Sequence, residues 1–191
     1  MASASTSFAD LRLATPRLEL RPFRHSDAAD LFAVYSHPEV YRHVPIGGWT
    51  HIDEAHQRIA RDINMMASGD YVRLAVERSE DERVLGEVLL FNFVRDSRRA
   101  EIGYALARDA WGGGYVREAL PPLIDLAFGR LELRRLEAEI DPRNVASAKV
   151  LERLGFRHEG LLRQRWIVRG EISDSGLYGL LGPDWLARKM S

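Results

Sequence analysis

The segment 105–119 runs from an apolar strand pattern through three consecutive glycines directly into a helical pattern. This order constrains the fold because it places the first amides of a helix, which have no helical acceptor, at the end of a strand. Such amides and the helix dipole together hold an anion well, and glycine lets the backbone approach a phosphate closely. We interpret Gly112, Gly113 and Gly114 as part of a pyrophosphate site. The alternative is an ordinary tight strand-to-helix turn with no ligand.

Two common phosphate-binding motifs do not fit this turn. A P-loop ends in Gly-Lys-Ser/Thr, whereas Gly114 is followed by Tyr115 and Val116. A dinucleotide-binding fingerprint needs a third glycine where this chain has Arg117. The turn therefore predicts a diphosphate site built from main-chain groups, without the P-loop lysine.

The composition excludes several classes of protein. The 191 residues include 27 basic and 28 acidic side chains, and a net charge of −1 argues against a nucleic-acid partner and against attraction to anionic membranes. The absence of cysteine excludes disulfides and thiolate metal sites, and the histidines lack metal-ligand spacing, so we expect no metal. No signal peptide or membrane-length apolar run is present. We expect a cytoplasmic protein with a disordered segment over residues 1–10 and a single domain over 11–191.

Strand patterns alternate with helical patterns along the chain. Alternating or continuous apolar runs predict strands over 17–23, 71–77, 84–94, 101–107, 135–140, 158–168 and 171–181. Helical spacing predicts helices over 26–37, from about residue 50 to Ser68, from 115 to Phe128, over 144–154, and a short one after Pro183. Pro121 and Pro122 predict a kink or break in the third of these helices. The alternation favours an α/β or α+β fold whose sheet has helices on both faces.

A second informative segment spans residues 141–156, where a strand ends and a helix opens. Asn144 and Ser147 are three residues apart, so they lie on one face of this helix. An asparagine amide both donates and accepts hydrogen bonds, which suits it to the amides of a pantetheine arm. The alternative is that Asn144 only caps the helix.

These two segments resemble the GNAT acetyltransferase superfamily. The run from Trp111 to Ala119 is similar to its acetyl-CoA pyrophosphate motif, and Asn144–Phe156 is similar to the motif that follows it, N-x-x-S-x-x-V-L-E-x-L-G-F. The similarity is greatest to the branch of ribosomal-protein alanine N-acetyltransferases (RimJ/RimL-like). Further segments that carry this similarity are Thr15–Arg21, Pro38–Val40, Trp166, Gly170, Asp174 and Tyr178.

The resemblance implies a twisted mixed sheet of about seven strands, flanked by helices on both faces, whose two central strands part at the middle. In this chain the parting is expected between 101–107 and 135–140. Acetyl-CoA is then the expected co-substrate. Leu106 and Ala107 would offer backbone groups to the arm and thioester, Trp111, Gly112, Gly113, Gly114 and Tyr115 would hold the pyrophosphate, and Asn144 and Ser147 would bind the arm. Asp109 departs from the motif, which prefers Gln or Arg there, and is expected to point away from the phosphates.

Transfer of an acetyl group to an amine needs removal of an amine proton and stabilisation of the leaving thiolate. The family tyrosine that serves as acid corresponds to Leu151, so Ser147, which matches the serine of the alanine N-acetyltransferase branch, is the expected alternative. Glu101 is our first choice as base, with an exposed strand-end charge as the alternative, and Asp174 is a second candidate. The glutamate of that branch corresponds to Trp166, a departure that weakens inheritance of its substrate.

We expect an N-acetyltransferase that acts on a primary amine, either a protein N-terminus or a small molecule. Dimers are common among the relatives, so a homodimer fits the resemblance. Two other classes stay open. A non-catalytic acyl-CoA-binding domain would bind without releasing thiol, and a nucleotide hydrolase would turn over ATP with magnesium.

Overall fold

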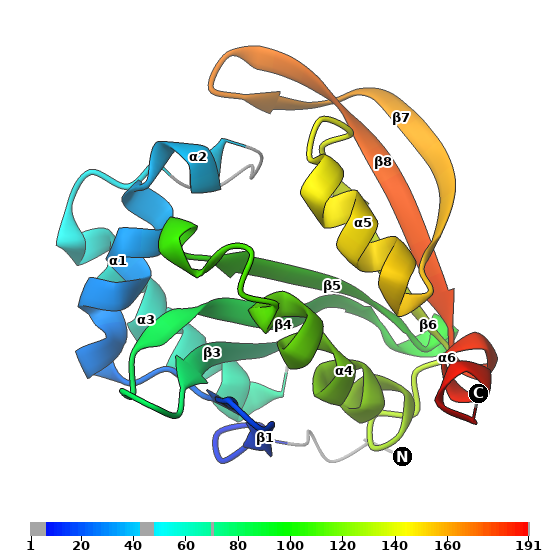
Figure 1. The fold of residues 1–191 in the computed structure, drawn as a ribbon, viewed down its shortest axis with the longest axis horizontal. Helices are drawn as coiled ribbons and strands as arrows, with labels where there is room; N and C mark the ends of the chain where they lie inside the picture. Colours follow the sequence, from blue (N-terminus) through cyan, green and yellow to red (C-terminus); the bar gives the residue numbers. More distant parts are fainter. Residues whose placement is uncertain (1–6, 43–47, 70, 191) are drawn as a thin grey trace.

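The computed structural model describes residues 7–42, 48–69 and 71–190. An eight-stranded sheet with the order β1-β2-β3-β4-β5-β6-β8-β7 organises this part of the chain (Figure 1). Its strands are β1 (Leu13–Ala14), β2 (Leu18–Arg21), β3 (Val72–Arg78), β4 (Val84–Val94), β5 (Arg99–Leu106), β6 (Arg135–Ile140), β7 (Arg157–Val168) and β8 (Glu171–Leu181). All neighbouring pairs are antiparallel except β5 with β6.

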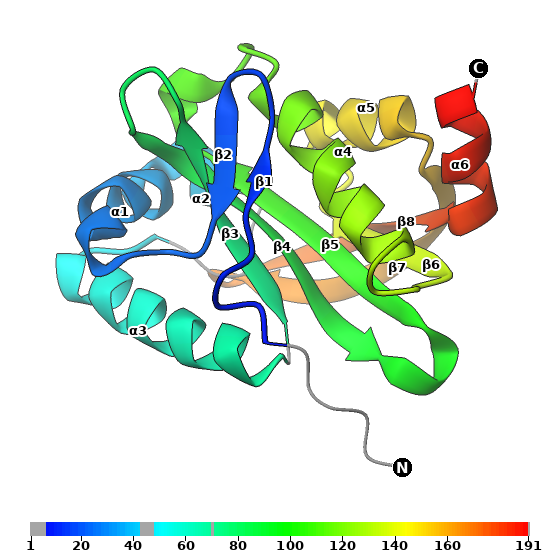
Figure 2. The ribbon, with the colours of Figure 1, turned by 90° about the horizontal axis from the view of Figure 1, so that it is seen from below.

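Helices cover both faces of the sheet, as predicted (Figure 2). One face packs against α1 (Ala28–Ser36) and α3 (Ile52–Ser68), and the other packs against α4 (Tyr115–Phe128) and α5 (Val145–Leu154). The short α2 (Pro38–Tyr41) follows α1, and α6 (Gly182–Met190) ends the described chain. Single turns of 3-10 helix form η1 (His25–Asp27), η2 (Arg95–Ser97) and η3 (Arg108–Ala110).

Three expectations about the elements need correction. The sheet has eight strands rather than about seven, because the two residues of β1 pair with β2 but are too few to show an alternating pattern. The predicted break at Pro121 and Pro122 is wrong: α4 continues through both prolines. Its inward side chains before and after them are buried, and this packing outweighs the lost backbone hydrogen bonds. The buried residues on either side of the two prolines are Ala119, Leu120, Leu123 and Ile124.

The predicted disorder of residues 1–10 is also wrong in part. Phe8 is only 4% exposed, packs in the main core, and donates its amide to the Met66 carbonyl at 2.9 Å. Burying one aromatic side chain stabilises an otherwise irregular segment by about 2 kcal/mol. Residues 1–6 lie outside the described residues.

The central strands part where the resemblance implies. β5 and β6 pair only at three positions, from Arg99 opposite Arg135 to Glu101 opposite Glu137. Beyond that point β5 continues to Leu106 without pairing with β6. β6 stays paired with its other neighbour, β8, along its whole length. The two strands therefore enclose a gap that opens toward the start of α4 and α5 (Figure 1).

Gly86 brings β4 unusually close to the last residues of β5. A Cβ added at Gly86 would lie 2.1 Å from the Ala105 carbonyl oxygen and 2.8 Å from the Leu106 Cα. The residue also has a φ of +153°, which L side chains rarely adopt. Gly86 therefore sets the position of the β5 segment that borders the gap.

Candidate active site

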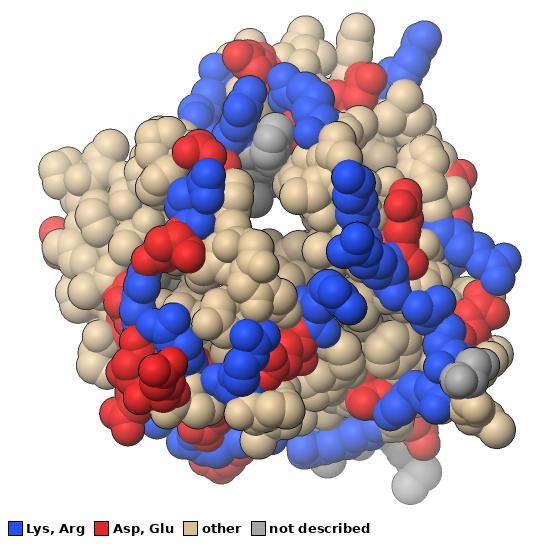
Figure 3. All heavy atoms as spheres, viewed as in Figure 1, with Lys and Arg blue, Asp and Glu red and all other residues tan. Residues whose placement is uncertain are grey.

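The gap between the parted strands contains a cavity of about 570 Å³, here called the β5–α5 cavity. The end of β5, the glycine turn before α4, the first half of α5 and residues of α2 line it. Figure 3 shows an opening near the middle of this face, with Lys and Arg side chains on its rim. The lining includes four arginines, Arg42, Arg117, Arg143 and Arg153, and one acidic residue, Glu39. Most of the charged side chains at the mouth are therefore cationic, which suits an anionic ligand.

The glycine turn has the backbone geometry that an anion site needs. Gly112 and Gly114 have φ of +76° and +79°, so glycine is the residue that these positions accept without strain. Gly114 is the N-cap of α4, and the first helical hydrogen bond runs from the Glu118 amide to the Gly114 carbonyl at 3.1 Å. The amides of residues 115–117 precede that bond, so they have no acceptor within the helix.

Side chains from the turn between β1 and β2 fix this glycine turn. Arg17 donates to the Gly113 carbonyl at 3.1 Å and to Glu118 at 2.7 Å, and its guanidinium lies 4.6 Å from the centre of the Tyr115 ring. Thr15 also donates to Glu118, at 2.7 Å. Burial would raise the pKa of Glu118, but the hydrogen bonds from Thr15 and Arg17 outweigh that effect and lower it. Contacts that span 96 to 103 residues of sequence thus hold the glycine turn in place.

The end of β5 offers fewer free backbone groups than expected. The Leu106 carbonyl accepts from the Trp111 indole nitrogen at 2.9 Å, and the Ala107 amide donates to the Leu85 carbonyl at 2.7 Å. Leu106, Trp111, Gly112, Gly114 and Tyr115 line the cavity, whereas Ala107 and Gly113 are not among its described lining residues. A carbonyl has a second lone pair, so Leu106 can still accept from a ligand.

Asp109 lies where the departure from the motif led us to expect it. Its carboxylate pairs with Arg83, with contacts of 2.7 and 3.1 Å, and the hydrogen bond from Arg83 lowers the pKa of Asp109. Asp109 is not among the described residues that line the cavity. Its negative charge is thus paired with Arg83, the residue before β4, and does not face the cavity.

Asn144 and Ser147 lie together at the start of α5, and both line the cavity. Asn144 is the N-cap, and its Oδ1 accepts from the Ser147 amide at 3.1 Å. The capping role that we considered as an alternative is therefore present, and it leaves the Nδ2 donors of the amide for another partner. Ser147 is only 8% exposed.

The sequence analysis missed Tyr104, whose hydroxyl lies 2.7 Å from the Ser147 Oγ inside the cavity. Burial raises the pKa of Tyr104 to about 12, and the hydrogen bond with Ser147 only partly opposes this. Period-two alternation could have indicated it, because Tyr104 shares the helix-facing side of β5 with Ala100, Ile102 and Leu106. It is the only hydroxyl among those four positions.

Glu101 lies at the paired end of β5, and alternation places its side chain on the face opposite Tyr104. It is partly buried and accepts from the Asn92 side chain at 3.0 Å. Glu101 is not among the described residues that line the β5–α5 cavity. The role of Glu101 as a base therefore remains a prediction, and it requires that the amine approach from the side of the sheet that α1 covers.

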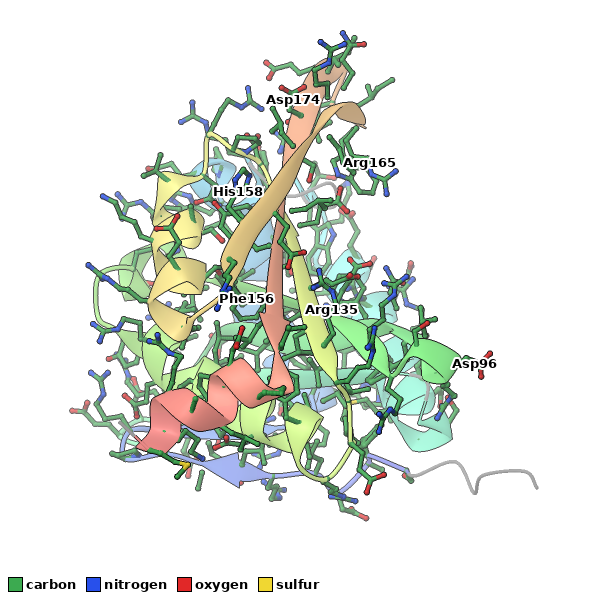
Figure 4. All side chains as sticks on the ribbon, turned by 90° about the vertical axis from the view of Figure 1, so that its right-hand side faces the viewer. Asp96, Arg135, Phe156, His158, Arg165 and Asp174 are labelled. Atoms are coloured by element: carbon green, nitrogen blue, oxygen red, sulfur yellow. The ribbon has the colours of Figure 1, made fainter. Side chains whose placement is uncertain are left out.

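Asp174 and Trp166 lie on the β7–β8 hairpin, which extends beyond the helices (Figure 4). Asp174 accepts from the amide of Gln164 at 2.7 Å, where β7 has a register shift and Gln164 has a φ of +53°. Trp166 donates to Glu139 on β6 at 2.9 Å. The Asp174 carboxylate thus binds the main chain of β7 at its register shift.

Neither a metal centre nor a membrane segment is found in the described part of the chain. No group of three or more His, Asp or Glu side chains in these residues could hold a metal ion. None of the helices among residues 7–42, 48–69 and 71–190 has the length and apolar character that crossing a membrane requires.

Comparison with known proteins identifies close relatives along most of the chain. Residues 17–157 match the model of the acetyltransferase (GNAT) domain. The chain is 36% identical over 170 residues to the uncharacterized N-acetyltransferase p20 of Bacillus licheniformis, which covers 88% of this chain and 95% of that protein. It is 30% identical over 186 residues to the [ribosomal protein uS5]-alanine N-acetyltransferase of Escherichia coli, covering 92% and 93% of the two chains. The ribosomal-protein-S5-alanine acetyltransferase of Vibrio fischeri has a similar structure, with a TM-score of 0.80 at 25% identity over 92% of this chain and 99% of that one.

Proposed function

Because this chain belongs to the GNAT acetyltransferase family and is an N-acetyltransferase, we propose that it transfers an acetyl group from acetyl-CoA directly to a primary amine. One observation carries the proposal. The β5–α5 cavity is lined both by the residues that carry the helix-start amides and by a pair of hydrogen-bonded hydroxyls, those of the partly buried Tyr104 and the buried Ser147. A molecule that has a diphosphate and a thioester separated by an extended arm matches this arrangement.

The residues present fit acetyl-CoA in charge and in hydrogen-bonding capacity. The amides of residues 115–117 and the positive end of α4 would hold the pyrophosphate, with Arg117 and Arg153 at the mouth adding positive charge. Asn144 would donate its free Nδ2 hydrogens to a carbonyl of the arm. Acetyl-CoA supplies the activated acyl group and the thiolate leaving group when bound, and no metal is needed for that chemistry.

Three tasks then fall to the protein itself. It must hold amine and thioester in contact, which by itself lowers the barrier by several kcal/mol. It must accept a proton from the amine, for which we propose Glu101, reached directly or through a water. It must also stabilise the thiolate, for which we propose the Ser147 hydroxyl because it lies within the cavity and is nearly buried.

The acceptor that we favour is the amino terminus of a protein. The Escherichia coli relative at 30% identity is named for acetylation of an alanine of ribosomal protein uS5. An acceptor of that kind would place the reaction in the cytoplasm. A small-molecule amine is the second acceptor class. The two classes differ in whether the nucleophilic nitrogen is attached to a peptide chain or to a small molecule.

The test measures release of free CoA thiol with acetyl-CoA and a panel of amines. The panel pairs short peptides that begin with alanine or serine with the same peptides blocked at the N-terminus, and adds small amines such as polyamines. We expect thiol release with the free peptides and none with the blocked ones. The Asn144→Ala variant should raise the KM for acetyl-CoA, whereas Asn64→Ala, the same substitution at an exposed position of α3, serves as its matched control.

Two results would contradict the proposal. Tight CoA binding by calorimetry with no thiol release across the panel would favour the non-catalytic acyl-CoA-binding alternative. Magnesium-dependent ATP turnover without any preference for CoA would favour a nucleotide hydrolase.

A further inference from the structure

Two hydroxyl groups meet inside the β5–α5 cavity, one from each side of the gap. The Tyr104 hydroxyl, on β5, lies 2.7 Å from the Oγ of Ser147, on α5, and both residues line the cavity. This contact joins two elements across the space that opens when β5 and β6 part. None of the roles proposed above for the other residues of the cavity requires a tyrosine at position 104.

Either oxygen could donate this hydrogen bond, and the geometry favours Tyr104 as the donor. The Tyr104 hydroxyl lies closer to the Ser147 Oγ, at 2.7 Å, than to the Ser147 carbonyl, at 3.3 Å. That carbonyl lies in the first turn of α5, where it accepts the amide four residues further along the helix. The serine oxygen is therefore the better acceptor for Tyr104. A serine that accepts through its oxygen still has its one proton to donate.

We propose that Tyr104 is a positioning residue that orients the Ser147 hydroxyl so that it donates a hydrogen bond to the sulfur of the departing CoA. The inference rests on the proposed function. In the transfer step the amine nitrogen forms a bond to the acetyl carbon, and the bond from that carbon to sulfur breaks. The electron pair of the broken bond stays on sulfur, and the amine proton passes to the base. Ser147 stabilises the resulting thiolate through its hydrogen bond, and solvent later supplies the thiol proton.

The acid strength of Tyr104 agrees with this role rather than with proton transfer from the tyrosine itself. Burial raises the pKa of Tyr104 to about 12, so the phenol stays protonated well above neutral pH. A thiolate, whose conjugate thiol has a pKa of about 8.5, is too weak a base to remove that proton. Tyr104 thus remains a hydrogen-bond donor to Ser147 throughout the reaction.

The test compares Tyr104→Phe, Ser147→Ala and the double variant with Tyr178→Phe. Tyr178 is the matched control because it is a buried tyrosine of the same core and is not among the described residues that line the cavity. Losing the orienting hydrogen bond should lower kcat about tenfold in Tyr104→Phe, with the KM for acetyl-CoA unchanged. The double variant should be no slower than Ser147→Ala, because Tyr104 acts through that serine.

A second readout needs no turnover. Ultraviolet titration of CoA bound to each variant reports the pKa of its thiol, which a donated hydrogen bond lowers. We expect that thiol pKa to be lower on the wild type and on Tyr178→Phe than on Tyr104→Phe. Thermal melts of all four variants establish that they are folded.

The outcomes separate the inference from the proposed function. An active wild type with equal kcat and thiol pKa in Tyr104→Phe and Tyr178→Phe would overturn the role of Tyr104 alone. Additive losses in the double variant would also overturn it, because they would show that the two hydroxyls act independently. A wild type that binds CoA but acetylates no amine would overturn the proposed function and this inference with it.

Discussion

Replacing Gly86 with alanine tests whether the close approach of β4 to β5 builds the active site. The new Cβ would lie 2.1 Å from the Ala105 carbonyl oxygen, 2.8 Å from the Leu106 Cα and 2.9 Å from a Leu106 side-chain carbon. Ordinary contacts are about 3.5 Å, so the end of β5 would have to move by more than about 1 Å. Overpacking and the strained φ of +153° each cost about 1 to 3 kcal/mol. We expect a loss of about 4 kcal/mol in the free energy of unfolding.

The same displacement should weaken CoA binding, because Ala105 and Leu106 line the cavity. Urea denaturation measures the stability, and calorimetry with CoA measures the affinity of the protein that remains folded. Gly160→Ala is the matched control, since an added Cβ there meets no atom within 4 Å. The reasoning is refuted if Gly86→Ala and Gly160→Ala differ by less than about 0.5 kcal/mol in the free energy of unfolding.

Three further predictions concern stability measured by urea denaturation. Arg21→Ala should cost about 3 to 5 kcal/mol, because Arg21 is 1% exposed and its removal takes away the buried cation that pairs with the carboxylates of Asp27 and Glu77; a loss below 1 kcal/mol would contradict this. Glu118→Gln should lose about 1 kcal/mol at pH 7, and the difference should vanish as the pH falls below about 4.3, because the lowered pKa of Glu118 stabilises the fold only while the carboxylate is charged. The raised pKa of Tyr104 predicts the opposite sign. The stability that Tyr104 contributes is complete below about pH 10 and is lost as the pH rises toward 12. The wild type should therefore lose more stability than Tyr104→Phe between these pH values, and equal losses in the two proteins would contradict the prediction.

Local patterns in the sequence predicted most of the elements. β4, β6 and β8 were predicted at their observed bounds, and β7 within one residue of its start. The glycine turn and the Asn144 cap were also recognisable, since both depend on hydrogen bonds between residues that are near in sequence. Local rules failed in α4, where Pro121 and Pro122 are tolerated because tertiary burial of the helix outweighs their cost.

Contacts between distant residues could not be predicted in the same way. Tyr104 and Ser147 are 43 residues apart, and Arg17 and Gly113 are 96 apart. Which side chains meet across a sheet depends on strand order and register, and a shift of one residue would place Tyr104 on the other face. Glu101 illustrates the same dependence. The sequence predicted that this carboxylate lies on the strand that leads to the glycine turn, but it did not predict which face of the sheet the side chain occupies.

The sequence by itself thus determined the succession of strands and helices, the glycine turn before α4 and the family, because periodicity, capping and motif spacing are properties of contiguous residues. Only the tertiary structure decided where β5 and β6 stop pairing, and which hydroxyls and arginines surround the resulting space. The physical reason is that these arrangements follow from packing of whole elements against one another, which no short segment specifies on its own.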